Sequence, residues 1–123
     1  MSVSNIAVAI FALLLIAAPA KTEEPAITLK LTPQVGFAPL TVYATIRIQP
    51  NWLNRAIRLE WESDRIHASA LWSVEGQYAP TAHYYVLKQL SADDYKVQAT
   101  IIRVMDSTTT LAQSIRVLDT IGP

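Results

Sequence analysis

The sequence predicts an all-β protein, an antiparallel sandwich of about seven strands preceded by a signal peptide. Three observations lead to this fold class. Apolar and polar residues alternate with period two in several short segments, which is typical of strands with one buried and one solvated face. Turn residues separate these segments at intervals of roughly 8–12 residues. No convincing helix appears beyond the N-terminal segment, and a length of 123 residues suits one domain.

The chain begins with an apolar leader. Residues 6–20 carry no charge, and a helix of this run would be about 22 Å long, shorter than a bilayer core of roughly 30 Å. Ala18 and Ala20 place small residues where a signal peptidase cuts. We therefore expect residues 1–20 to be a secretory signal peptide cut after Ala20, followed by a linker over residues 21–25. The leader has no Lys or Arg before its apolar run, so an uncleaved anchor over residues 3–20 and a buried helix remain alternatives.

The composition limits the partners and the compartment. The 10 basic and 10 acidic side chains give a formal net charge of zero and form no cluster of lysines and arginines along the sequence. We therefore expect no nucleic-acid partner, and membrane contact only if residues 3–20 are retained. The absence of cysteine removes thiolate catalysis, cysteine-based zinc sites and disulfides. Together with the leader, this predicts a secreted, periplasmic or cell-surface protein of bacterial type.

The domain is expected over residues 26–118, and its first two strands are clear. Residues 26–31 and residues 40–48 alternate strictly, and Val42 lies on the inward face of the second segment. Pro33 and Gly36 mark the turn between them, because proline restricts φ and glycine tolerates positive φ.

The next two strands surround a central tryptophan. After a loop over residues 51–56, residues 57–62 alternate with Leu59 and Trp61 on the inward phase. We expect Trp61 to be a core residue, because such a ring contributes much of the buried area of a sandwich. Residues 66–74 are ambiguous between helix and strand, and we interpret them as an irregular strand.

Three strands complete the domain: residues 82–90, 95–105 and 111–118. Tyr95 follows a turn and begins a strand, as in a tyrosine corner, and Val97 shares its inward face. The inward phase slips at Ile101 and Ile102, which predicts a β-bulge there. Residues 119–123 form a tail.

About seven short strands with one central tryptophan are typical of an immunoglobulin-like sandwich. The stretch from Thr32 to Val42, with its Gly-Phe-Ala-Pro-Leu-Thr-Val run, resembles the P-x-x-G-x-A-P-L-x-V opening of PKD domains. Trp61 is similar to the strand-C tryptophan of that family, and Tyr95-Lys96-Val97 is similar to its Y-x-V motif. His83-Tyr84-Tyr85 is similar to its H-x-Y motif, and the resemblance covers residues 26–118. The sequence departs from the family after Trp61, where no glycine forms the acidic turn.

Four aromatic residues are candidates for a binding surface: Trp52, Trp72, Tyr84 and Tyr85. Tyr84 and Tyr85 are adjacent, so in a regular strand one of them points outward. Exposed rings stack on sugars or anchor protein interfaces. Isolated exposed rings are also common on surfaces without a function.

Catalytic and metal sites are not indicated. The two histidines, His67 and His83, lack the spacing of a zinc site. The acidic pairs Glu62/Asp64 and Asp93-Asp94 do not supply the oxygen density that Ca²⁺ needs, so we interpret them as solvated turn residues. No nucleophile elbow or phosphate loop is present. We expect no cofactor, no metal and no enzymatic activity.

The resemblance to PKD domains implies an extracellular, non-catalytic module. From it we expect an exported interaction module that binds another envelope or surface protein as a subunit or accessory factor. One alternative is a carbohydrate-binding module in which at least two of the four candidate rings lie coplanar on one face. Another is a membrane-anchored structural subunit that retains its N-terminal helix. Fold analogy alone does not establish any of these functions.

Overall fold

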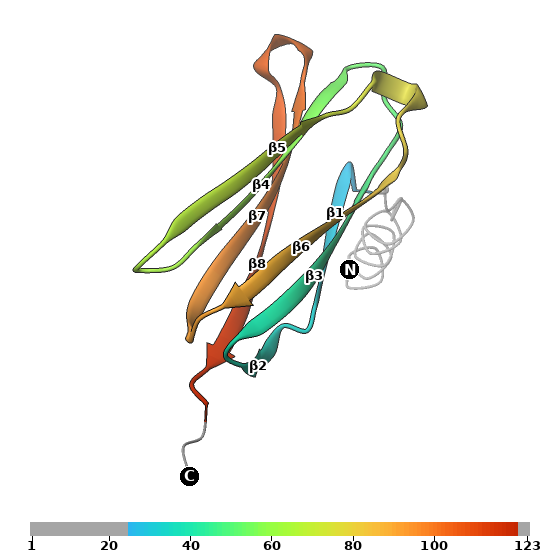
Figure 1. Cartoon of the computed structure of the whole chain (residues 1–123). Helices are drawn as coiled ribbons and strands as arrows, with labels where there is room; N and C mark the ends of the chain where they lie inside the picture. The colour runs from blue at the N-terminus through green and yellow to red at the C-terminus, as the bar shows by residue number, and fades with distance from the viewer. Residues whose placement is uncertain (1–24, 121–123) are drawn as a thin grey trace, which may run out of the picture.

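The computed structural model describes residues 25–120, which form an immunoglobulin-like sandwich of two β-sheets (Figure 1). The predicted signal peptide over residues 1–20 lies outside the described residues, as does all of the predicted linker except Pro25. The strands are β1 (Ile27–Thr32), β2 (Val35–Phe37), β3 (Leu40–Ile48), β4 (Asn54–Glu62), β5 (His67–Ser73), β6 (Ala82–Leu90), β7 (Asp93–Arg103) and β8 (Thr108–Leu118). Two short 3₁₀ turns, η1 (Gly76–Tyr78) and η2 (Val104–Asp106), lie in connections. Between residues 25 and 120, no helix is long and apolar enough to cross a membrane.

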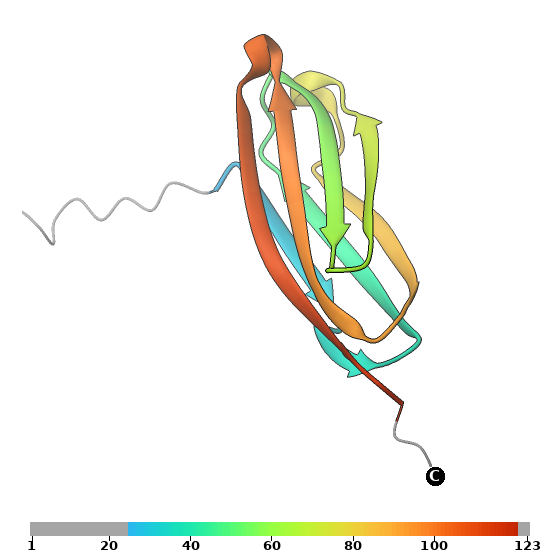
Figure 2. The same ribbon diagram turned by 90° about the vertical axis from the view of Figure 1, so that its left-hand side faces the viewer.

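One sheet has three strands in the order β1-β3-β6, and the other has five in the order β2-β8-β7-β4-β5. Figure 2 shows β8, β7, β4 and β5 side by side in the second sheet. All neighbouring strands are antiparallel except β2 and β8, which pair in parallel. The predicted all-β, immunoglobulin-like fold class is therefore confirmed.

The core lies between the sheets and is built from the inward phase of each strand. Val42, Leu59 and Val97 are fully buried. Tyr95 is also buried, and its hydroxyl donates a hydrogen bond to the backbone oxygen of Ser91 at 2.8 Å. This is the geometry of a tyrosine corner, and it anchors the connection that carries the chain from β6 in one sheet to β7 in the other.

Several predictions about the strands need correction. The predicted loop over residues 51–56 includes the start of β4 at Asn54, and the predicted strand over residues 95–105 ends at Arg103, before η2. The short strand β2 begins within the expected turn over residues 32–36, and three residues are too few for alternation to reveal it. The bulge expected at Ile101–Ile102 lies instead in β4, where the pairing with β7 shifts between Asn54 and Ala56. β7 itself continues regularly, with Ile101 inward and fully buried and Ile102 on the outer face.

Trp61 is half-buried and packs against the core, rather than lying at its centre. Its neighbours across the strands are Val97 in β7 and Ala68 in β5, so it points between the sheets near the β5 edge. Its ring meets that of Tyr85 from the other sheet, with centroids 5.5 Å apart. The period-two pattern predicted the correct face, but it contains no information on how near a strand lies to the edge of its sheet.

Candidate anion-binding site

Charge is divided unequally between the two sheets. Strands β1, β3 and β6 contain Lys30, Arg47 and Lys88 and not one carboxylate. Every carboxylate of residues 25–120 belongs to the five-stranded sheet or to the loops at its strand ends. A chain with zero net charge therefore has one sheet that is purely cationic.

Two of these cations lie together on the outer face of the three-stranded sheet. In the pairing of β1 with β3, Lys30 is opposite Thr45 and Thr28 is opposite Arg47. Lys30 and Arg47 are thus diagonal neighbours, and such positions in a sheet are about 7–8 Å apart. Tyr84 of β6 lies opposite Thr45 on the other side.

These five residues line a shallow depression of about 370 Å³: Thr28, Lys30, Thr45, Arg47 and Tyr84. We call this set the anion cradle. It offers an ammonium group, a guanidinium group and three hydroxyl groups, all of which can donate hydrogen bonds. Because no carboxylate lies on these strands, nothing within the cradle competes with an incoming anion for these donors.

The cations of the cradle have no anionic partner among residues 25–120. The ion pairs in this part of the chain all involve the five-stranded sheet and its loops: Arg58–Glu60, Arg65–Asp93, His67–Glu60 and Arg116–Asp94. Two like charges at the spacing of Lys30 and Arg47 repel by about 0.5 kcal/mol in water. An anion between them would remove this repulsion and accept charge-assisted hydrogen bonds, which are stronger than neutral ones.

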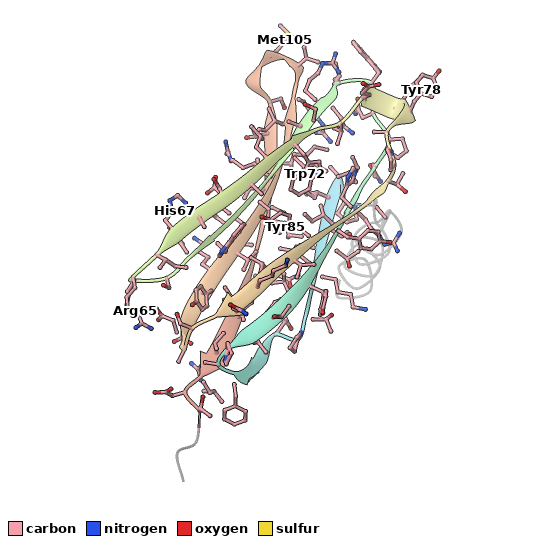
Figure 3. The ribbon with its side chains drawn as sticks, in the orientation of Figure 1. Arg65, His67, Trp72, Tyr78, Tyr85 and Met105 are labelled. Carbon is pink, nitrogen blue, oxygen red and sulfur yellow. The ribbon has the colours of Figure 1, made fainter. Side chains whose placement is uncertain are left out.

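The four predicted aromatic candidates do not form one surface. Tyr84 is exposed in the anion cradle, and Trp52 is exposed in the loop between β3 and β4. Trp72 and Tyr85 are half-buried between the sheets, where their rings are nearly parallel with centroids 6.1 Å apart (Figure 3). The coplanar exposed pair that a carbohydrate-binding module requires is therefore not present among these four rings.

The two histidines lie on different sheets. His67 is exposed at the start of β5, and its Nε2 is 3.9 Å from a carboxylate oxygen of Glu60. His83 in β6 accepts a hydrogen bond at Nδ1 from the Trp72 indole N–H at 3.2 Å. Its Nε2 is 2.7 Å from the backbone oxygen of Pro80, which assigns the proton to Nε2. His83 thus acts as a structural link between the sheets.

One carboxyl group has a perturbed pKa. The hydroxyl of Ser63, the backbone N–H of Asp94 and the guanidinium of Arg65 lower the pKa of Asp93 below its ordinary value of 3.8. Arg65 Nε donates to Asp93 Oδ2 at 3.2 Å. These groups tie the β4–β5 turn to the start of β7, and none of them lines the cradle, so we interpret the shift as structural.

Comparison with solved structures reveals the same fold in an enzyme. The chain is similar to superoxide reductase (neelaredoxin) from Ignicoccus hospitalis, with 14% identity, a TM-score of 0.58, and coverage of 76% of this chain and 80% of the other. A point variant of that protein matches with 16% identity and a TM-score of 0.63, covering 81% and 86% of the two chains. Murine CRIg matches with 9% identity and a TM-score of 0.46, covering 79% of this chain and 100% of the other. No protein-family model matches the sequence, and no curated protein matches it.

These matches correct the functional prediction. The exported non-catalytic interaction module was inferred from a resemblance to PKD domains, and its two alternatives were a carbohydrate-binding module and a membrane-anchored structural subunit. The structural matches are instead to proteins named as superoxide reductases. A sandwich of this kind therefore does not indicate a non-catalytic module, although at this identity the likeness itself extends only to the fold.

Residues 25–120 do not bring together the ligands of a redox metal centre. Proteins hold such metals with histidine, cysteine and carboxylate side chains, and this sequence contains two histidines and no cysteine. Among residues 25–120, no three side chains of the types His, Cys, Asp and Glu come together. We therefore assign no reduction step to this chain.

The sequence prediction missed the anion cradle. Lys30 and Arg47 are both on the outward phase of well-predicted strands, so their exposure could have been inferred. Their proximity depends on the register between β1 and β3, which alternation does not specify. The signal that was available is the absence of Asp and Glu from three strands that each contain a Lys or Arg.

Proposed function

We propose that the protein binds a small anion in the anion cradle. The observation that carries this proposal is the pair Lys30 and Arg47, which lie close together on a carboxylate-free face without an anionic partner between residues 25 and 120. The ligand class is an oxyanion or an acidic head group. The guanidinium of Arg47 can contact two oxygens of such a group at once, and the ammonium group of Lys30 supplies a point charge.

The shape of the cradle supports a small ligand rather than a macromolecule. Only five residues line the depression. The third cation of the sheet, Lys88, lies outside it, four residues beyond Tyr84 in β6, a distance of about 13 Å along a strand. Nucleic-acid sites need a longer row of cations. One anionic group therefore matches the available donors better than a polyanion does.

A titration of the full-length protein with inorganic phosphate tests the proposal. Backbone amide NMR shifts should change with phosphate concentration around Thr45 and Arg47, with chloride used to hold ionic strength constant. We expect a dissociation constant of about 1 mM, which corresponds to roughly −4 kcal/mol. Arg47→Gln and Lys30→Gln should each weaken binding by about fivefold or more, because each removes a charge-assisted donor.

Lys88→Gln is the matched control, since it removes a cation from the same face outside the cradle. It should weaken phosphate binding less than about twofold. Equal effects of Lys88→Gln and Arg47→Gln on the dissociation constant would mean that phosphate responds to the charge of the whole face, and this would contradict the proposal.

A further inference from the structure

Three connections meet at one end of the sandwich, the end opposite the C-terminus of the described chain (Figure 1). They are the loop between β3 and β4, the turn η1 and the turn η2. The backbone N–H of Val104 in η2 donates to the oxygen of Leu53 in the β3–β4 loop at 2.9 Å. Gly76 of η1 lies against the backbone of Trp52, so close that a Cβ atom there would be 3.3 Å from the Trp52 oxygen. The three connections therefore form one continuous end surface.

Each connection presents one large apolar side chain to solvent. The exposed fractions are 65% for Trp52, 88% for Tyr78 and 94% for Met105, and the last two are the highest among large hydrophobic residues in the described part of the chain. Figure 3 shows Tyr78 and Met105 projecting outward at this end. We call Trp52, Tyr78 and Met105 the apolar rim.

The connections that carry the rim are held by hydrogen bonds and backbone conformation rather than by packing of the three rim side chains. Met105 has a φ of 65°, a left-handed conformation that residues other than glycine rarely adopt. Beneath the rim, the fully buried Asn54 donates from Nδ2 to the oxygen of Gln49 at 3.0 Å and accepts from Arg103 Nε at 3.2 Å. Arg55 Nη1 donates to the oxygen of Trp52 at 2.7 Å. The loop is therefore ordered before any partner arrives, so docking costs little conformational entropy.

We infer that the apolar rim docks the protein onto the surface of a lipid bilayer. Tryptophan and tyrosine combine an apolar ring with one polar atom, and they are enriched where a membrane meets water. Methionine is flexible and apolar, which suits insertion among acyl chains. The rim consists of three separate projecting tips, whereas a stable protein interface uses a broad, closely packed patch.

The path of the chain supports this orientation. The backbone N–H of Gln49 donates to the oxygen of Ala26 at 3.0 Å, so β1 begins beside the β3–β4 loop. In the sequence, the uncharged run over residues 6–20 ends six residues before Ala26. The chain therefore enters the fold at the same end as the rim.

Fluorescence quenching by bromine-labelled lipid tests this inference. The full-length protein is mixed with phosphatidylcholine vesicles whose acyl chains carry bromine, and tryptophan emission is recorded. Trp61 and Trp72 are half-buried in the sandwich and serve as an internal reference. We expect quenching in the wild-type protein that is lost in Trp52→Phe, because Trp52 is the tryptophan of the rim. Quenching that persists in Trp52→Phe, or no quenching in the wild type, would overturn the inference.

A matched pair of variants separates the rim from general surface hydrophobicity. Met105→Ser and Tyr78→Ser should each reduce quenching of Trp52 by about twofold or more, because each removes an inserted tip. Leu71→Ser is the control: Leu71 is 65% exposed, like Trp52, but lies within strand β5 rather than in one of the three connections. An effect of Leu71→Ser as large as that of Tyr78→Ser would also overturn the inference. All three side chains are exposed, so none of these variants threatens folding.

Discussion

The two long sides of the sandwich are closed in different ways. On the side formed by β1, β2 and β8, most of the hydrogen bonds are between backbone atoms. β2 pairs in parallel with β8, and Arg116 N–H donates to the oxygen of Gln34 at 2.8 Å. The Gln113 side chain reaches across from β8 to donate to the backbone oxygen of Leu29 in β1. Because β1 and β2 follow each other in the chain, the backbone itself passes from one sheet to the other on this side, and Gln113 adds one hydrogen bond between the sheets.

On the side formed by β5 and β6, side-chain packing rather than backbone hydrogen bonding connects the two sheets. No ladder joins these two strands. Instead Trp72 from β5 stacks on Tyr85 of β6 at an interplanar angle of 3°, and Trp61 contacts the same tyrosine from β4. A hydrogen bond from the Trp72 indole N–H to His83 fixes the orientation of the Trp72 ring in this packing. An immunoglobulin-like sandwich can therefore leave one side without a backbone ladder where aromatic side chains fill the gap between the sheets.

The most severe test of this comparison is Trp72→Ala. The change removes the ring that contacts both Tyr85 and His83, so we expect the free energy of unfolding to fall by about 3 kcal/mol. Urea unfolding of the full-length protein measures it, with an unchanged slope as evidence of a two-state transition. Trp52→Ala is the control and should change stability by less than about 0.5 kcal/mol, because that ring is exposed. A loss below about 1 kcal/mol for Trp72→Ala would mean that the open side does not depend on aromatic packing.

Tyr95→Phe tests the connection between β6 and β7, where the chain passes from the three-stranded to the five-stranded sheet. It removes only the hydroxyl that bonds the backbone oxygen of Ser91. Because Tyr95 is buried, we expect a loss of about 1.5 kcal/mol, within the range for a buried hydrogen bond whose acceptor is left unpaired. Thermal unfolding followed by circular dichroism measures it. Tyr84→Phe, which alters an exposed ring, should leave the midpoint unchanged.

Gln113→Ala tests the closed side and should have a smaller effect. It removes the side-chain bonds to Leu29 and Gln34, while the ladder between β2 and β8 remains. We expect a loss of about 1 kcal/mol in urea unfolding, the usual size for one net hydrogen bond, because the bond to Leu29 is part-buried and the bond to Gln34 is exposed and contributes little. A loss equal to that of Trp72→Ala would show that both sides depend equally on single side chains.

The smallest expected effect concerns the pH dependence of the Arg65–Asp93 pair, which joins the β4–β5 turn to the start of β7. The folded-state pKa of Asp93 is lowered, so its carboxylate stabilises the fold at pH values above the ordinary pKa of 3.8. This contribution is lost as pH falls below 3.8 through the lowered pKa of the folded state. Unfolding midpoints measured between about pH 5 and pH 2.5 should fall slightly less steeply for Asp93→Asn than for the wild type. Identical slopes would mean that the pair has no influence on stability.

Alternation in the sequence was sufficient to determine the fold class and most strand positions. Residues 40–48 and 82–90 form strands with the bounds that the sequence predicted, because a half-buried strand must place apolar residues at every second position. The tyrosine corner could also be predicted, since Tyr95 stands between a turn and an apolar alternation. Both features depend only on residues that are close together in the sequence.

Only the tertiary structure decided which residues meet. Strand register brings Lys30 beside Arg47, although they are far apart in sequence, and edge position leaves Trp72 and Tyr85 half-buried rather than on an exposed face. Three loops that share no sequence pattern place Trp52, Tyr78 and Met105 at one end. These arrangements follow from how the two sheets stack and where each strand ends. Period-two alternation fixes only the face on which a side chain lies, so it carries no information about neighbours across strands or sheets.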